Sequence, residues 1–239
     1  MSAQQVYDKL LNESDILHAA GSISFSLNGV SIRVKERNVV GNILEEWLYK
    51  WLQEKGFNVI HNTTQNPPDF WLNPDDRESD LLEIKSFYKS PSFDIAAFMS
   101  YVNEIKEKPY RLFSDYLIIQ YNMNSKTGDV SIVKAWLKKV WEISAPSERF
   151  PIKTQYKNKQ IVNIRPATWY AKRAKFPTFK SKEHFISALE ETIYQYPETH
   201  AVATTWKRDL CENYYRKYNE RLEIPRWNDI KEEYGFRAR

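Results

Sequence analysis

The first half of the chain contains a segment whose apolar residues recur at helical spacing. Between residues 42 and 52, apolar side chains stand at positions 44, 47, 48, 51 and 52, so one face of a helix would be turned toward a core. Gly56 follows shortly afterwards, and a glycine commonly stands just past the end of a helix. The pattern predicts an amphipathic helix, followed by a short strand over residues 57–60.

Alternating and continuous apolar runs predict strands elsewhere. Residues 22–34 alternate around Asn28-Gly29, a dipeptide typical of a type I′ turn. We expect a hairpin there that mainly covers one side of the core, with DNA contact or dimer formation as alternatives. Residues 115–121 and 130–142 predict two more strands joined by a turn. Further helices are expected at about residues 2–19, 94–106, 181–194 and 206–222.

The order of these elements predicts the fold. Helix, strand, hairpin, helix and strand follow one another between residues 38 and 142, which is typical of a mixed central sheet flanked by helices. We therefore expect an α/β (α+β) fold in which residues 1–239 form one elaborated domain with its core at about 38–142. The hairpin at 22–34 and the region at about 150–239 are expected to be accessory to that core.

A second hairpin carries the candidate chemistry. Asp69 follows two prolines, a polar turn occupies residues 73–77, and an apolar strand follows at residues 81–85. Residues two apart on a strand point to the same face, so Glu83 and Lys85 share one face. Leu82 and Ile84 take the opposite face, toward the core. The turn would bring Glu83 back beside Asp69.

Two converging carboxylates repel each other unless a cation joins them. An oxygen-rich site of this kind suits Mg²⁺, which keeps several waters and completes its shell from substrate phosphate. Protonated Lys85 would offset charge on a phosphate under attack, and neutral Lys85 would help to orient or deprotonate water. The plainer alternative is that Asp69 is a turn residue and that Glu83 and Lys85 lie on a solvated edge strand.

The pattern resembles that of the PD-(D/E)xK nuclease superfamily, with Pro68-Asp69 as its first element and Glu83-Ile84-Lys85 as its second. The preceding helix and strand stand in the order found in the catalytic core of that superfamily. The resemblance implies that Asp69 and Glu83 hold Mg²⁺ together with the carbonyl oxygen of Ile84. It also implies that Lys85 positions or activates the attacking water.

The predicted helix adds one acidic candidate. In many restriction enzymes of that superfamily, a glutamate four residues after a glycine on this helix supports the metal site. Gly41 and Glu45 fit that spacing. The resemblance therefore implies a supporting role for Glu45, and the alternative is a solubilising charge on an exposed flank of the helix.

Within that superfamily the chain is similar to type II restriction endonucleases, because neither a helicase motor nor a repeat nor a separate DNA-binding module accompanies the core. The specific motifs cover roughly residues 41–134. The final third is similar to small restriction enzymes of the NgoBV and NlaIV kind, although no single motif there carries the likeness. Accessory elements for DNA recognition and dimerisation would then surround the core.

The resemblance implies an activity and partners. It implies Mg²⁺-dependent, sequence-specific hydrolysis of double-stranded DNA that leaves 5′-phosphate ends. It also implies a homodimer, and a cognate DNA methyltransferase that protects the host. Two alternatives are a structure-selective junction or repair nuclease of the same fold and a non-catalytic DNA-binding protein.

Charge is distributed unevenly along the chain. The formal net charge of +4 is only mildly basic and permits nucleic-acid binding without arguing for it. Residues 153–182, however, contain no acidic residue, and their lysines and arginines alternate with aromatics. Such a mixture can contact phosphates and stack on bases, and the alternative is a solvated loop beside an aromatic cluster. The candidate DNA-contact residues are Lys153, Lys157, Arg165, Lys172, Arg173 and Lys175.

Cysteine and glycine usage excludes several classes of protein. The one cysteine, Cys211, excludes an intrachain disulfide and a cysteine-based zinc site, so we expect a reducing setting, the bacterial cytoplasm. The first twenty residues are too polar for a signal peptide, and no stretch is long and apolar enough for a membrane span. The chain has only six glycines and no glycine-rich phosphate loop, which argues against an ATP-driven motor.

Overall fold

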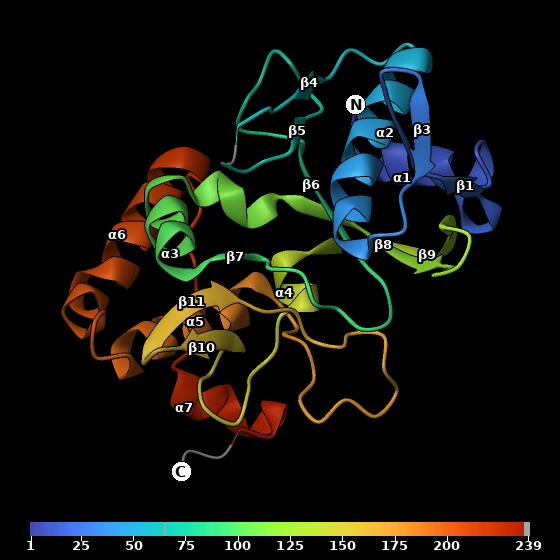
Figure 1. Cartoon of the computed structure of the whole chain (residues 1–239). Helices are drawn as coiled ribbons and strands as arrows, with labels where there is room; N and C mark the ends of the chain where they lie inside the picture. Colours follow the sequence, from blue (N-terminus) through green and yellow to red (C-terminus); the bar gives the residue numbers. More distant parts are fainter. Residues whose placement is uncertain (65, 237–239) are drawn as a thin grey trace. The chain divides into compact units, whose positions relative to one another are not determined.

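The chain folds into two units in the computed structural model, which describes residues 1–64 and 66–236. Unit 1 comprises Met1–Pro91 and Ser114–Lys138, and unit 2 comprises Ser92–Phe113 and Lys139–Arg239. Figure 1 labels the helices and strands of both. That residues 1–239 act as one elaborated domain stays a prediction.

Unit 1 is built on helix α2 and a six-stranded sheet. Its helical elements are α1 (Ala3–Asn12), η1 (Ile16–His18), η2 (Arg37–Val39) and α2 (Val40–Glu54). Its strands are β1 (Ala20–Ser22), β2 (Ser24–Leu27), β3 (Val30–Arg33), β4 (Ile60–His61), β5 (Phe70–Trp71), β6 (Leu81–Phe87), β8 (Asp115–Met123) and β9 (Asp129–Lys139), the last of which ends at the start of unit 2.

The sheet of unit 1 is mixed, as the sequence predicts. Its strand order is β1-β9-β8-β6-β5-β4; β6 and β8 are parallel, and the pairs β1–β9, β5–β6 and β4–β5 are antiparallel. Leu82, Ile84 and Leu117 are buried in its core, which explains the continuous apolar run of the two parallel strands. The expected α/β (α+β) fold with a mixed central sheet flanked by helices is confirmed.

Helix α2 lies against β6 because one small residue lets the two backbones approach. Leu48 and Leu52 of the helix are fully buried, which confirms the predicted apolar face. A β-carbon added at Gly41 would lie 3.2 Å from the Oγ of Ser86 on β6. Gly41 therefore permits the close contact that carries Glu45, one turn further along α2, toward the same strand.

Two predicted elements of unit 1 are shorter than expected. The first helix ends at Asn12 instead of residue 19, because Asp15 takes a left-handed conformation (φ 46°) that interrupts the helix. The strand expected at 57–60 is reduced to Ile60–His61, where it pairs with the two residues of β5. Val59 nevertheless packs into the core, so the apolar pattern marks burial more accurately than strand limits.

The hairpin β2–β3 forms where the sequence predicts it, but it does not cover the core. Asn28 and Gly29 both have positive φ angles, 46° and 79°, as a type I′ turn requires. All eight strand residues are exposed. The expectation that this hairpin covers one side of the core is therefore wrong, because α1 and α2 supply the apolar side chains that pack there.

Unit 2 combines helices with a small antiparallel sheet of order β10-β11-β7. Trp206 of α6 is fully buried, and its Nε1 donates a hydrogen bond to the carbonyl oxygen of Val102, 2.8 Å away. The elements of unit 2 are β7 (Ala96–Ala97), α3 (Phe98–Glu107), η3 (Pro109–Phe113), α4 (Val140–Ile143), β10 (Thr154–Lys157), β11 (Gln160–Ile164), α5 (Lys182–Gln195), α6 (His200–Tyr218), α7 (Trp227–Ile230) and η4 (Lys231–Tyr234).

Candidate active site

Asp69 is fixed by the hairpin that the sequence predicts. Strands β5 and β6 pair antiparallel with Phe70 opposite Leu82, so Asp69, the residue just before β5, lies beside Glu83. The backbone N–H of Ile84 donates a hydrogen bond to Oδ2 of Asp69 over 2.7 Å. A backbone donor of this kind holds the carboxylate in one orientation without a second side chain.

Glu83 and Lys85 share one face of β6, as alternation predicts. The Nζ atom of Lys85 lies 3.2 Å from Oε2 of Glu83 and 4.0 Å from Oδ2 of Asp69. Exposure of the side chains is 4% for Glu83, 21% for Lys85 and 22% for Asp69. The structure therefore brings the three predicted residues together at a site that is largely shielded from water but still reachable from solvent.

Burial and neighbouring charge determine the protonation of this group. Burial, reinforced by the negative charge of Glu83, raises the pKa of Asp69 to about 7, against the opposing effect of Lys85. Burial by itself would lower the pKa of Lys85, but the carboxylates of Glu83 and Asp69 outweigh it and raise that pKa. The lysine is thus held as a cation, and two carboxyl groups compete for it.

A residue that the sequence analysis missed, His61, connects Glu45 to the site. Nε2 of His61 lies 2.9 Å from Oε1 of Glu45, across the gap between β4 and α2. The His61 ring stacks on Phe70, with centroids 4.9 Å apart, and lies 4.8 Å from the ring of Tyr49. Phe70 directly follows Asp69, so the aromatic contacts of His61 connect the Glu45 carboxylate to the strand that begins just after Asp69.

The charge of Glu45 acts on two of the other candidates, Asp69 and Lys85. Its negative charge contributes to the raised pKa of Asp69 and to that of Lys85. The supporting position implied for Glu45 is thus compatible with the geometry. The only sequence signal that could have found His61 is its place on the strand next to Asp69, because the four histidines have no paired spacing.

The donor set fits a magnesium ion better than a metal bound entirely by protein. Among residues 1–64 and 66–236, no group of three or more His, Cys, Asp or Glu side chains is arranged to hold a metal ion. Mg²⁺ characteristically takes only one or two carboxylates and keeps several waters. The carboxylates of Asp69, which is partly buried, and Glu83, which is buried, repel each other beside the Lys85 ammonium and meet that requirement.

The basic candidates of unit 2 divide into two groups. Three are engaged within the unit: Lys153 donates to the carbonyl oxygen of Pro166 over 2.9 Å, Arg165 pairs with Asp94, and Lys175 pairs with Glu148. The other three, which have no side-chain partner in the described part of the chain, are Lys157, Lys172 and Arg173. All three are exposed. The segment begins with the hairpin β10–β11 and only then becomes a loop.

No helix within the described residues has both the length and the apolar character needed to cross a bilayer.

Comparisons with known proteins place the whole chain among restriction enzymes. The model of the NgoBV restriction endonuclease family matches residues 1–234. The type II restriction enzyme NlaIV of Neisseria lactamica is 46% identical over 238 residues, which cover 98% of each chain. The type II restriction enzyme NgoBV of Neisseria gonorrhoeae is 43% identical over 173 residues, 70% of this chain and 95% of that protein. The solved structure of the NlaIV restriction endonuclease matches with a TM-score of 0.93 and 46% identity, covering 98% of this chain and 96% of that one.

Proposed function

This chain belongs to the NgoBV restriction endonuclease family and is a type II restriction enzyme, a site-specific deoxyribonuclease, and from that premise we propose that Asp69, Glu83 and Lys85 hydrolyse double-stranded DNA with the help of Mg²⁺. The observation that carries the proposal is that the carboxylates of Asp69 and Glu83 both lie within 4.0 Å of the Lys85 ammonium on one hairpin. Neither carboxylate is free to move away, because Asp69 is held by the N–H of Ile84 and Glu83 is buried.

Asp69 and Glu83 are the residues that would hold the metal ion, with the carbonyl oxygen of Ile84 as a third donor. Mg²⁺ bound there would supply Lewis-acid stabilisation of charge on the scissile phosphate and lower the pKa of a coordinated water. Burial of the two carboxylates supports this role, because the cost of holding both ionised side by side is relieved only by added positive charge.

Lys85 supplies the second positive charge. Its raised pKa keeps the ammonium protonated between the two carboxylates, where it can donate to a phosphate oxygen and hold the attacking water in line. Glu45, fixed by His61, supports the site from α2. In the overall reaction, water adds its oxygen to phosphorus, the P–O3′ bond breaks, and the 3′ oxygen leaves with a proton, so the ends are 5′-phosphate and 3′-hydroxyl.

Further partners follow from the proposed activity. One copy of the site cuts one strand, so cleavage of both strands at one place calls for two sites, which a homodimer with twofold symmetry would provide. A cognate DNA methyltransferase would protect the host sequence. The enzyme would then act in the bacterial cytoplasm, where incoming DNA is met.

The test is digestion of unmethylated phage DNA by the purified chain, with Mg²⁺ or with EDTA. We expect discrete Mg²⁺-dependent bands and a loss of cleavage of at least about 100-fold in Asp69→Ala, with DNA binding largely retained. Asp75→Ala, which removes an exposed carboxylate from the turn of the same hairpin, is the matched control and should cut as the wild type does. Bands that persist in EDTA, or in Asp69→Ala, would refute the proposed site.

The same protein, given branched synthetic DNA beside the phage DNA, separates this function from that of a junction or repair nuclease of the same fold. A site-specific enzyme gives the same set of fragments from one DNA every time. A structure-selective enzyme would cut branched synthetic DNA irrespective of sequence and would leave linear phage DNA intact.

A further inference from the structure

The hairpin β2–β3 has one wholly apolar face. Phe25 pairs with Ile32, and Leu27 with Val30, so these four side chains share one face of the ribbon. The opposite face carries three serines and Arg33. The apolar side chains are exposed to 53%, 56%, 66% and 66% for Phe25, Ile32, Leu27 and Val30. An alternation this regular normally marks a face that is covered.

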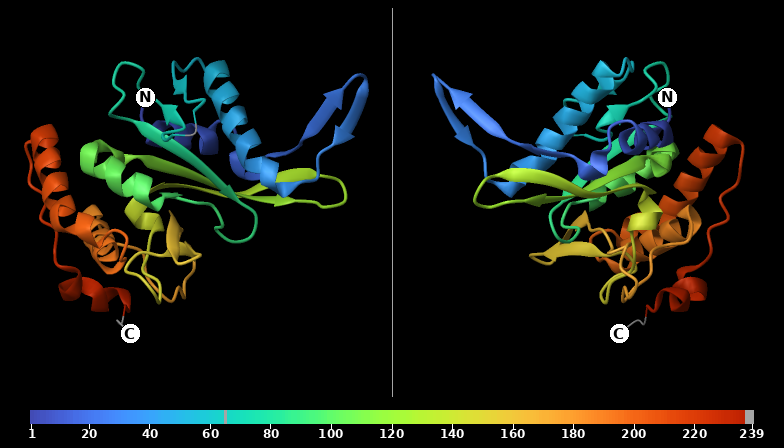
Figure 2. Two further views of the ribbon diagram at one scale, coloured as in Figure 1. Left: turned by 60° about the vertical axis from the view of Figure 1, so that its left-hand side comes forward. Right: turned by 90° about the vertical axis from the view of Figure 1, so that its right-hand side faces the viewer.

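The rest of unit 1 holds the base of the hairpin and leaves its apolar face uncovered. The backbone N–H of Val34 donates to the carbonyl oxygen of Ile23 over 2.8 Å, and Arg33 pairs with Asp129 at 3.2 Å. Beyond this base the ribbon, blue in Figure 2, projects away from α2 and from the sheet of the same unit. A two-stranded ribbon is marginally stable by itself in water, so a well-formed apolar arm of this kind needs a partner surface.

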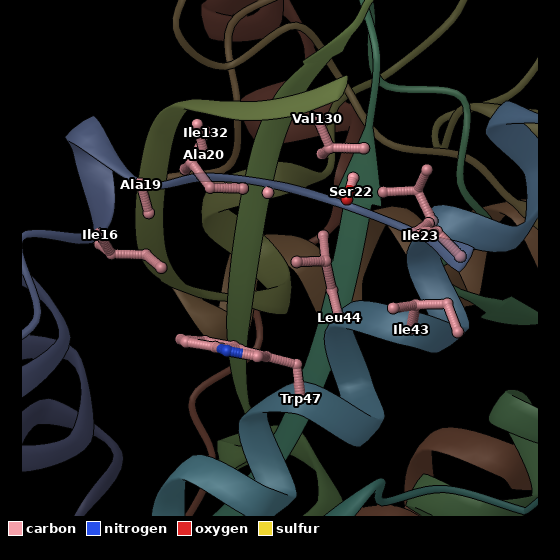
Figure 3. Close-up of a pocket in the computed structure, with 12 residues that line it drawn as sticks. Ile16, Ala19, Ala20, Ser22, Ile23, Ile43, Leu44, Trp47, Val130 and Ile132 are labelled. Carbon is pink, nitrogen blue, oxygen red and sulfur yellow. The ribbon is translucent and has the colours of Figure 1, made fainter. Parts of the chain in front are cut away.

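A small apolar pocket opens in the same unit, where the chain enters the hairpin. Its volume is about 200 Å³, and of the described residues that line it none is charged. Ile23, which immediately precedes β2, lies on one side of it, and Leu44 and Trp47 of α2 lie on the other (Figure 3). Ile43 and Trp47 at its rim are themselves partly exposed. The pocket is smaller than the ~300–1,000 Å³ typical of a small-molecule site and suits apolar side chains.

The surface area agrees with an interface between two proteins. The exposed parts of the four hairpin side chains, Ile43 and Trp47 together amount to on the order of 500 Å², at the upper end for an apolar patch on a monomer. A standard interface buries about 800 Å² on each partner, a little over half of it apolar. One hairpin and one pocket from each copy would therefore supply the apolar part of a complete interface.

The chemistry of the surface selects among possible partners. DNA is disfavoured, because phosphate contacts need free cations and the cation on the hairpin strands, Arg33, is already paired with Asp129. A second copy of this chain is favoured, because each copy offers a projecting apolar face and, where the chain enters the hairpin, an apolar pocket. That combination is self-complementary under a twofold axis, where each copy gives and receives the same contact.

We propose that the Phe25–Leu27–Val30–Ile32 face of the hairpin of each copy packs over the pocket of a second copy, so that two reciprocal contacts form the homodimer interface. The proposal names the surface of the homodimer in the proposed function and rests on that function in this respect. In this dimer the apolar face of the hairpin contacts the other subunit, and the opposite face, which carries the serines, is exposed to solvent.

Oligomeric mass measures the proposal directly. Light scattering or sedimentation over a wide range of protein concentration should give twice the 28.4 kDa of one chain for the wild type. Leu27→Ser/Val30→Ser and, separately, Ile43→Ser should give the mass of one chain, with a dissociation constant raised at least about 30-fold for the double variant. Val162→Ser is the matched control, because Val162 is an equally aliphatic residue of unit 2 with 42% exposure. Unfolding curves should show that all variants fold, since each changed side chain is largely outside the core.

Cross-linking tests the reciprocal contact itself. In a Cys211→Ser background, Leu27→Cys combined with Ile43→Cys should give a covalent dimer with a short bismaleimide, and Leu27→Cys combined with Val162→Cys should not. A wild type that is monomeric, or hairpin variants that keep the double mass, would overturn the proposal. If the wild type is a dimer, the variants are monomers and the wild type never cuts DNA, only the proposed function is contradicted. If the wild type cuts DNA and the variants stay dimeric, only this inference is contradicted.

Discussion

Nε2 of His61 lies 2.9 Å from Oε1 of Glu45, and the His61 ring contacts the rings of both Tyr49 and Phe70, which also lie close to each other. The carboxylate can only accept, so the imidazole N–H donates to it. Glu45 is carried by α2 and Phe70 by β5, beside Asp69. One histidine thus connects the helix that carries Glu45 to the strand that begins just after Asp69.

Removing the His61 donor should slow cleavage and leave DNA binding almost unchanged. His61→Phe keeps an aromatic ring in contact with Tyr49 and Phe70 but removes the hydrogen bond to Glu45. Residues that orient the groups around a metal typically contribute 10–100-fold, so we expect kcat to fall by about 10-fold or more at saturating Mg²⁺ while KM for DNA changes little. Steady-state cleavage of a plasmid gives both constants.

Two further variants show whether the hydrogen bond or the packing is responsible. His61→Gln can still donate to Glu45 and should recover part of the lost kcat. His18→Phe is the matched control, because His18 forms a similar contact with Asp15 at 2.6 Å on an exposed surface. If His61→Phe and His18→Phe cut equally well, His61 does not position Glu45.

The catalytic hairpin was predictable because its geometry is local. Alternation along one strand places Glu83 and Lys85 on one face, and a short polar turn brings Asp69 back beside them. The position of His61 is different in kind. Its contact with Glu45 depends on how α2 lies across β4, which follows from packing between segments far apart in the sequence and leaves no periodic signal.

Asp69 should make the metal-free protein less stable as the pH rises. Burial and the charge of Glu83 raise the pKa of Asp69 to about 7, whereas an unfolded aspartate titrates near ~3.9. Between about pH 4 and pH 7 the folded chain therefore binds a proton that the unfolded chain has lost, and the free energy of unfolding falls with rising pH. Asp69→Asn removes this cost, and its amide oxygen can still accept from the N–H of Ile84.

The expected result is a variant that is more stable than the wild type in EDTA at pH 8. The gain should be on the order of 2 kcal/mol, or about 5 °C in Tm for a chain of this length, and should shrink toward pH 4. Mg²⁺ should then raise the Tm of the wild type but not that of Asp69→Asn. Asp75→Asn, at an exposed position of the adjacent turn, should show neither effect. A gain that is the same at every pH would contradict the raised pKa.

Gly128 should be the least replaceable glycine of unit 1 for a steric reason. It has φ 77°, and a β-carbon there would lie 2.8 Å from the carbonyl oxygen of Val34 at the base of the β2–β3 hairpin. Gly56 has nearly the same φ, 76°, with nothing within 4 Å of such a β-carbon. Gly56→Ala should therefore cost about 1–2 kcal/mol for the left-handed backbone alone, and Gly128→Ala clearly more. Thermal unfolding of both variants measures the difference. Equal losses of stability would show that the base of the hairpin can shift to accommodate the added β-carbon without further loss of stability.

The exposure of the β2–β3 hairpin could not be deduced from its sequence. Phe25 and Leu27 alternate with serines as they would in a strand that covers its own core, and the Asn28-Gly29 turn is the same in either case. What decides the outcome is whether another part of the chain reaches that face. Residues that pack on the sheet from α1 and α2 already fill the core, and a pattern along one segment carries no information about that competition.

Lys172 and Arg173 should contribute to DNA binding through phosphate contacts. Both are exposed in the loop between β11 and α5 and have no side-chain partner within the described residues. The slope of log K against log salt is negative, and each phosphate contact that is lost reduces its magnitude by about 0.9. The double variant Lys172→Ala/Arg173→Ala should therefore reduce that magnitude by roughly 2. The measurement is binding of duplex DNA in EDTA over a range of salt.

Arg165→Ala is the informative control, because Arg165 pairs with Asp94 and donates to the carbonyl oxygen of Ser92 over 2.7 Å. Its loss should lower Tm and leave the salt slope nearly unchanged, since that arginine is already engaged within unit 2. A slope that changes in Arg165→Ala but not in the double variant would reverse the assignment of the two groups.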